Sequence, residues 1–443
     1  VVLMVGFCQA AEITRIDLGR DVKMRILVDK TMAPTNNWVT EPWMIEEAKQ
    51  AGVNVFVPRA NHDDLHKVKR VAHWCKRRDM FYMPWMRGTL GAGSDVPDEK
   101  KAVWADGLVD SLWSPNSDEF WDWTERYIVD YAKMSARNEH FIGVFLDYEN
   151  YASGPNGYDL SYDEIILKKF ADAQDIHLPD LAPDERKEWL VQHSLHDAFE
   201  EFQVNHWRQR CKALREAVDR CNPDFRFCVY PAPGTKFIQE AIYPEWATEQ
   251  APLILADPCT YGRPSRMAPQ SEAVRENRSR LAERMEIPRQ AGINFLYAGG
   301  IDPCVRGADP EFAGKDAVII SDVSDGYWVF YECVEYESAH SEYFRWFRWA
   351  NNAINRRHFA AAYEPRQTPE TFGVEAFHAV SNAQKRVLPE VTGDTVEFPP
   401  MTLRRENLLL LTCTRGEPVT VHLQNIPVAD YECSRFWKIR DRD

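Results

Sequence analysis

The chain has 443 residues, of which 44% are hydrophobic and 12% aromatic, including 15 Trp. This composition is typical of a globular protein with a large core, and the length suffices for one large barrel with an accessory module. The formal net charge of −15 argues against a nucleic acid or an anionic membrane surface as partner, because both would be repelled. It favours an uncharged or weakly charged substrate.

The N-terminal segment is apolar and ends in small residues near Ala10 and Ala11. This pattern is typical of the end of a secretory signal peptide, and the alternative is a buried first strand. We predict that residues 1–11 are a signal peptide remnant and that the protein is secreted or periplasmic. No other segment has the roughly 18 consecutive apolar residues of a membrane-spanning helix, so no membrane span is expected.

Short apolar runs alternate with amphipathic helical patterns between residues 21 and 359. Eight such runs span residues 24–29, 53–58, 80–85, 142–147, 225–231, 252–257, 293–299 and 327–332. Continuous apolar strands that alternate with helices are typical of a parallel sheet whose outer face is covered by helices. We therefore predict a (β/α)8 TIM barrel over 21–359, closed by a last helix over 338–359.

The remaining residues, 360–443, contain short β-type runs separated by turn residues. They predict a small C-terminal all-β module after the barrel. The runs are few for a closed sandwich, which suggests that the sequence ends inside this module.

The ends of the predicted strands carry the residues with chemical potential, because the active sites of such barrels lie at the C-terminal ends of the strands. These ends form a ring of carboxylates and aromatic side chains with few cations. Aromatic faces pack against the C–H surfaces of sugars, and carboxylates supply the acid and base of glycosidic cleavage. We therefore expect a carbohydrate substrate, bound by Trp85, Arg87, Tyr148, Tyr151, Tyr230, Tyr261, Tyr297 and Trp328.

Asp147 and Glu149 lie two residues apart at the end of the fourth strand, in the sequence HFIGVFLDYENY (140–151). Side chains at i and i+2 of a strand point to the same side, so the two charges repel each other. We expect a raised pKa at Glu149, which then holds a proton near neutral pH, while Asp147 stays ionised. Such a pair suits a general acid and its partner. The alternative is that Asp147 caps the next segment and Glu149 is solvated or ion-paired.

This D-x-E resembles the second half of the D-x-x-D-x-D-x-E signature of family 18 glycoside hydrolases, the chitinase-like barrels. Trp328 on the eighth strand and Tyr261 after the sixth stand where those enzymes carry aromatic residues around the sugar. The resemblance implies that Glu149 is the general acid. It also implies that Asp147 orients and stabilises the acetamido group of the substrate as that group attacks the anomeric carbon.

The family 18 pattern is incomplete in this chain, because Ile142 and Phe145 stand where the signature has its earlier acids. The broader resemblance to barrel glycoside hydrolases covers residues 21–359. For a substrate without an acetamido group, Asp147 would itself be the nucleophile, and Asp257 or Glu332 would supply the acid.

These features predict a secreted glycoside hydrolase that cleaves a poly- or oligosaccharide without a cofactor or metal. Two other classes stay open: a non-catalytic carbohydrate-binding barrel, and a metal-dependent barrel hydrolase that uses His62 and Asp147. His62 and His66 lie one helical turn apart without a third ligand nearby, and the ten Cys include no C-x-x-C pair. A zinc site is therefore not expected.

Overall fold

The computed structural model describes residues 13–59, 62–149, 158–262, 270–302, 310–332 and 336–363, together with six strands between residues 372 and 424. None of the helices in these ranges combines the length and the apolar character needed to span a bilayer. The predicted signal peptide remnant, residues 1–11, lies outside them, so secretion stays a prediction.

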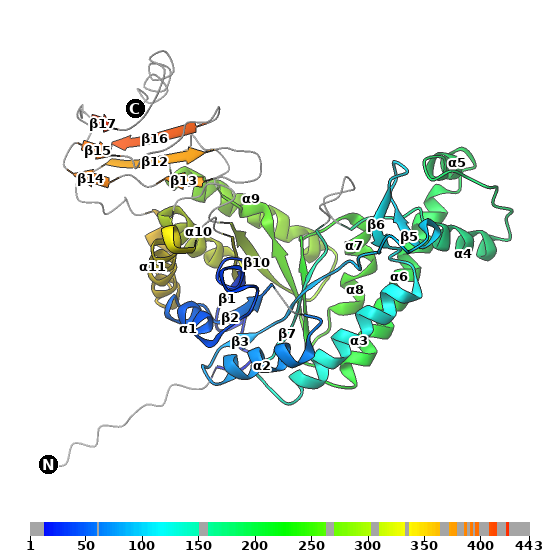
Figure 1. Cartoon of the computed structure of the whole chain (residues 1–443), viewed down its shortest axis with the longest axis horizontal. Helices are drawn as coiled ribbons and strands as arrows, with labels where there is room; N and C mark the ends of the chain where they lie inside the picture. Colours follow the sequence, from blue (N-terminus) through cyan, green and yellow to red (C-terminus); the bar gives the residue numbers. More distant parts are fainter. Residues whose placement is uncertain are drawn as a thin grey trace.

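A parallel sheet of nine strands forms the centre of the molecule (Figure 1). β3 and β4 follow each other in the chain with only Met83 and Pro84 between them, and they form the two edges of the sheet. The sheet therefore curls into a ring of eight barrel strands, consistent with a TIM-type barrel. In sheet order the strands are β3 (Phe81–Tyr82), β2 (Val55–Pro58), β1 (Met24–Asp29), β11 (Gly326–Tyr331), β10 (Phe295–Ile301), β9 (Leu253–Asp257), β8 (Arg226–Tyr230), β7 (Gly143–Asp147) and β4 (Trp85–Arg87).

Each of the eight predicted runs overlaps an observed strand, and only the third is interrupted. Pro84 has no N–H to donate to the ladder, which explains why this barrel strand is split into β3 and β4. The interruption does not break the ring, because β3 pairs with β2 and β4 pairs with β7.

Helices follow the strands and cover the outer face of the sheet (Figure 1). A two-stranded hairpin of β5 (Lys101–Val103) and β6 (Val109–Trp113) interrupts this pattern between β4 and α3. The helices are α1 (Pro42–Gln50), α2 (Leu65–Lys76), α3 (Asp118–Ser135), α4 (Glu164–Gln174), α5 (Arg186–Gln192), α6 (His196–Asp219), α7 (Lys236–Ala241), α8 (Tyr243–Trp246), α9 (Gln270–Gln290), α10 (Pro310–Val323) and α11 (Tyr336–Asn355).

Two buried clusters show which strand residues face the barrel axis. The larger cluster combines strand residues such as Leu27 and Phe56 with helix residues, so it fills the space between sheet and helices. The smaller cluster consists mainly of strand residues, with Ile26 and Val55 among them, so it fills the barrel interior. Successive residues of a strand alternate between these two faces.

The described strands beyond residue 363 form two small sheets. β12 (Phe372–His378) pairs with β13 (Lys385–Val387) and with β16 (Asn407–Cys413). β15 (Thr395–Glu397) pairs with β14 (Glu390–Thr392) and with β17 (His422–Gln424). The C-terminal module as a separate all-β unit, and its boundary at residue 360, stay predictions.

Candidate active site at the barrel mouth

The C-terminal ends of the barrel strands meet at one mouth, and the alternation along each strand decides which side chains enter it. Trp85, Tyr230 and Trp328 belong to the interior cluster, so Arg87 and Phe330, two positions after the two Trp residues, also face inward. Tyr261 is the residue directly after the short helix η3 (Pro258–Thr260). It joins this group because its ring packs on Trp328. The mouth is thus lined by Lys30, Arg59, Trp85, Arg87, Asp147, Glu149, Tyr230, Tyr261, Asp302, Trp328, Phe330 and Glu332.

Asp147 lies on the floor of the mouth and is only 1% exposed. Its Oδ2 accepts a hydrogen bond from Arg87 Nη1 at 3.1 Å, and its Oδ1 accepts one from the backbone N–H of Glu149 at 2.9 Å. Burial raises the pKa of Asp147 to about 6, although Arg87 and the Glu149 N–H act in the opposite direction. At pH 7 a carboxyl with this pKa is still mostly ionised, as expected from the sequence, but burial in the strand makes its ionisation more costly than that of an exposed Asp.

Asp147→Asn should stabilise the fold at neutral pH. The raised pKa means that ionising Asp147 costs the folded state more than the unfolded state; this cost is absent below about pH 4, grows up to about pH 6 and is full above it. A shift from 3.8 to about 6 corresponds to a cost on the order of 2–3 kcal/mol, which the variant avoids at pH 7. Thermal unfolding at pH 4 and pH 7 tests this, and a variant that melts below wild type at pH 7 would refute it.

Glu149 is half-buried at the mouth, and its backbone is held on both sides. Its N–H donates to Asp147, and its carbonyl oxygen accepts a hydrogen bond from Arg87 Nη1 at 3.0 Å. Arg87 thus binds the Asp147 side chain and the Glu149 backbone together. The side chain of Glu149 is not part of these bonds, so it can point its carboxyl into the mouth from a fixed backbone.

The hydroxyl of Tyr261 marks the place where acids from two different strands approach each other. Burial raises the pKa of Tyr261, and Tyr230, Asp302 and Glu149 each raise it further. Both carboxylates therefore lie close enough to act on this hydroxyl. Glu149 follows β7 and Asp302 follows β10, with two barrel strands between them, so the two carboxylates reach the mouth from different sides.

Glu332, which we expected as a catalytic acid, faces the mouth but already has a cationic partner. Its carboxylate forms an ion pair with Lys30, whose ammonium also lies 5.2 Å from the centre of the Phe330 ring. Asp302 was not among the expected site residues. It lies at an inward position after β10 and, like Glu149, raises the pKa of Tyr261, so it is a further candidate partner of Glu149.

Three of the expected site residues lie on the outer face of the strands and not at the mouth. Asp257 is fully buried there and accepts hydrogen bonds from Arg284 Nε and the Cys259 N–H, both at 2.7 Å, and from the Tyr297 hydroxyl. Tyr148 is buried in the cluster between sheet and helices. The structure therefore does not bring Asp257, Tyr297 or Tyr148 to the candidate site.

Tyr297→Phe should destabilise the protein without a matching loss of activity. The variant removes a hydroxyl that donates to the buried carboxylate of Asp257, and a hydrogen bond to a charged group contributes about 1.5–3 kcal/mol. Urea unfolding followed by Trp fluorescence measures this loss. If instead KM for a glycoside rises by tenfold or more while stability is kept, Tyr297 contacts the sugar after all.

The two Trp residues expected as sugar platforms are largely covered. Trp85 is 7% exposed, and the guanidinium groups of Arg59 and Arg87 lie 4.9 and 5.6 Å from its ring centre. Trp328 is 1% exposed. Its neighbours at ring-centre distances of 5.0 to 5.7 Å are Phe145, Tyr230 and Tyr261. Both Trp side chains therefore form the floor of the mouth, below the carboxylates.

The remaining expectations concern Tyr151 and a metal site. Tyr151 lies outside the described residues. His62 packs edge-on against Trp123 and Tyr127, both at 6.2 Å between ring centres, and burial lowers its pKa. In the part of the chain that the structure describes, no group of three or more His, Cys, Asp or Glu is placed to hold a metal ion.

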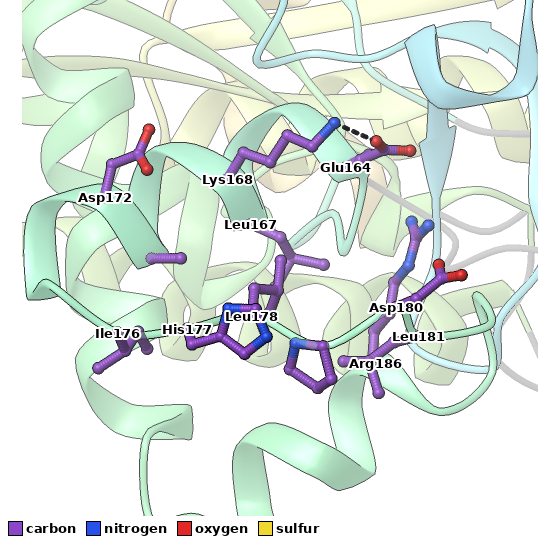
Figure 2. A pocket seen from close by; sticks show the side chains of 12 residues that line it. Glu164, Leu167, Lys168, Asp172, Ile176, His177, Leu178, Asp180, Leu181 and Arg186 are labelled. Atoms are coloured by element: carbon purple, nitrogen blue, oxygen red, sulfur yellow. Dashed lines mark hydrogen bonds and ion pairs between the residues drawn. The ribbon is translucent and has the colours of Figure 1, made fainter.

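A pocket of about 490 Å³ lies outside the barrel, on α4 and the segment that leads to α5 (Figures 1 and 2). Its charged side chains come mostly from α4, where Lys168 pairs with Glu164 one turn away. Such i,i+4 pairs are typical of a solvated helix face. The pocket shares no residue with the mouth, so the candidate site remains at the strand ends.

Comparison with known proteins identifies the fold but no family. No protein-family model matches the sequence, and no curated protein matches it. Among solved structures, the chain is similar to the β-galactosidase from Bacillus circulans sp. alkalophilus, with a TM-score of 0.52 and 12% identity over 76% of this chain and 57% of that chain. It is also similar to a β-galactosidase from the haloarchaeon Halorubrum lacusprofundi, with a TM-score of 0.50 and 11% identity over 75% of this chain and 58% of that chain.

These similarities show a shared TIM-type barrel fold. The chain spans less than three fifths of the length of both β-galactosidases. A shared fold does not assign catalytic residues. The roles of the residues in this site therefore depend on their own geometry.

Proposed function

We propose that the protein is a glycoside hydrolase that cleaves O-glycosidic bonds of a poly- or oligosaccharide at the barrel mouth. The observation that carries the proposal is the placement of Glu149 and Asp302 at inward positions after two separate barrel strands, both near enough to Tyr261 to raise its pKa. Hydrolysis of a glycosidic bond needs two carboxyl groups that flank the sugar. The β-galactosidases of the same fold support this class of reaction.

In this proposal Glu149 is the general acid that protonates the leaving oxygen. Its backbone is fixed by Arg87 and Asp147, and its carboxyl is only half-buried, so it can reach a substrate. Asp302 acts from the other side, as nucleophile or as the base that activates water. Asp147 positions Glu149 and adds negative charge beneath the developing positive charge of the sugar.

A substrate-assisted route, as the family 18 resemblance implies, is the second form of the same proposal. Asp147 faces the mouth beside Glu149, so it would contact an acetamido group on the sugar. In that case N-acetylhexosaminides are cleaved and the matching glycosides without the acetamido group are not. If both are cleaved equally well, Asp302 is the partner of Glu149.

Secretion belongs to the proposal as well, supported by the apolar segment that ends at Ala10 and Ala11. Mass spectrometry of the exported protein tests it. A mature N-terminus close to residue 11 is expected, and an exported chain that keeps the apolar segment would contradict it.

A screen of aryl glycosides, galactosides and N-acetylhexosaminides included, tests the proposed function. Release of the aryl group by wild type and its loss in Glu149→Gln support the hydrolase. Binding of sugars without turnover would assign a carbohydrate-binding barrel. Activity that disappears with a chelator and returns with added metal would assign a metal-dependent hydrolase.

A further inference from the structure

The charges around the barrel mouth are divided into two arcs. The cations Lys30, Arg59 and Arg87 lie at or just after the ends of β1, β2 and β4, which are neighbouring barrel strands, whereas the carboxylates lie at or just after the ends of β7, β10 and β11. Lys30 is paired with Glu332, and Arg87 with Asp147. Arg59 is therefore the cation of this arc for which the described residues supply no carboxylate partner.

The guanidinium of Arg59 lies over the faces of two aromatic rings. It lies 4.9 Å from the ring centre of Trp85 and 5.6 Å from that of Phe330. Its Nε is buried and has no hydrogen-bond partner within the described parts of the chain. Stacking fixes the plane of a guanidinium and leaves the N–H groups at its edge for a planar anion.

Arg59 also lies close to the catalytic carboxylates. Its charge lowers the pKa of Asp147, against the larger effect of burial. An anion bound by Arg59 would thus belong to the sugar that occupies the cleavage site and not to a distant part of the glycan. A buried donor without a partner costs free energy, which a bound anion would recover.

We propose that Arg59 binds an anionic substituent of the sugar in the cleavage site, either the carboxylate of a uronic acid or a sulfate ester. The inference rests on the proposed glycosidase function and names its substrate class, acidic glycans. Guanidinium groups bind carboxylate and sulfate oxygens in pairs of parallel hydrogen bonds. Arg87 and Lys30 on the neighbouring strands are each paired with a carboxylate, so among the described residues Arg59 is the cation of this arc that is left to bind the anion.

The net charge of −15 favoured an uncharged or weakly charged substrate. A substituent bound at the mouth, however, responds mainly to the charged side chains close to it. Exposed charges are screened beyond about 8 Å at physiological ionic strength, so most surface carboxylates do not act on a substituent at the mouth. The anion would lie on the side of β1, β2 and β4, next to Arg59. Asp302 and Glu332 lie on other barrel strands.

Matched aryl glycosides that differ only at the sixth carbon of the sugar test this inference. The pairs are a glucuronide against a glucoside, a galacturonide against a galactoside, and a 6-sulfated against an unsulfated glycoside. We expect wild type to prefer one charged member, and Arg59→Gln to lower the ratio of kcat/KM, charged over neutral, on the order of 10- to 100-fold. The effect of Arg59 on Asp147 cancels in this ratio, because both substrates use the same carboxylates.

Arg70→Gln is the matched control. Arg70 lies on the exposed side of α2 with its guanidinium 5.2 Å from the ring centre of Trp74, so the variant removes the same charge and the same type of stacking away from the mouth. Its ratio should equal that of wild type. The member of the series that wild type prefers distinguishes a uronic acid from a sulfate ester.

The inference fails if wild type hydrolyses neutral glycosides and Arg59→Gln leaves the ratio unchanged, while the proposed function stands. If no glycoside is hydrolysed, the proposed function fails, and calorimetry with glucuronic acid, glucose and glucose 6-sulfate decides the anion site separately. Binding of an acidic sugar that disappears in Arg59→Gln supports the site, and absence of such binding overturns it.

Discussion

Glu149→Gln lowers kcat on an unactivated glycoside by roughly 10²- to 10⁴-fold, the contribution typical of general acid catalysis. The amide keeps the shape of the side chain but has no acidic proton for the departing oxygen. The loss should shrink towards wild type with a dinitrophenyl leaving group, which departs without protonation. The fold should be unaffected, because the hydrogen bonds of Glu149 to Arg87 and Asp147 are made by its backbone.

Glu286→Gln is the control for this experiment. Glu286 lies near the end of α9, 49% exposed, and pairs with Arg289 on the same helix, so its replacement should change neither kcat nor the dependence on the leaving group. A Glu149→Gln variant with near wild-type kcat on the unactivated glycoside would show that the acid is another residue.

Asp302→Asn is expected to lower kcat by about 10²- to 10⁴-fold as well, but for good and poor leaving groups alike. A nucleophile or base is needed whether or not the leaving oxygen requires a proton. The two roles are thus separated by the dependence of kcat on the pKa of the leaving group. This dependence should become steeper in Glu149→Gln and stay as in wild type in Asp302→Asn.

Glu332→Gln is the comparison variant for Asp302→Asn, because both residues are candidates for the carboxylate that acts with Glu149. Glu332 also faces the mouth, but it is paired with Lys30, so we expect a smaller loss than in Asp302→Asn. The opposite order, with Glu332→Gln inactive and Asp302→Asn active, would assign the partner role to Glu332. In that case the shared effect of Glu149 and Asp302 on Tyr261 would not identify the catalytic pair.

The barrel strands could be predicted from the sequence because parallel strands are buried on both faces. Each appears as a short apolar run between helical patterns, and each predicted run overlaps a strand. The common direction of Asp147 and Glu149 also followed from the period of a strand. The sequence did not show the phase of each strand, that is, which residues face the barrel axis and which face the helices. A run that is apolar on both faces has no alternation of apolar and polar residues.

This missing phase explains the errors among the expected site residues. Asp257 stands at the end of β9, as predicted, and Tyr297 lies within β10, but both are residues that point towards the helices. Asp302 follows the inward positions of β10, of which Leu296 and Ala298 lie in the interior cluster. Counting in steps of two from these residues would have found it, once the inward phase was known.

The setting of Arg59 could not be predicted either. The sequence places a cation directly after the second strand, and that position fits an ion pair as well as it fits a substrate contact. Its stacking depends on Trp85 from the third barrel strand and Phe330 from the eighth. These residues come together only when the ring closes.

The central claim, that Glu149 and Asp302 act on one sugar, is tested most directly by a double-mutant cycle in kcat on an unactivated glycoside. Groups that act as a unit show losses that do not multiply. We predict that Glu149→Gln with Asp302→Asn loses no more than about tenfold beyond the worse single variant. Losses that multiply in the double variant, with both single variants folded, would contradict the claim.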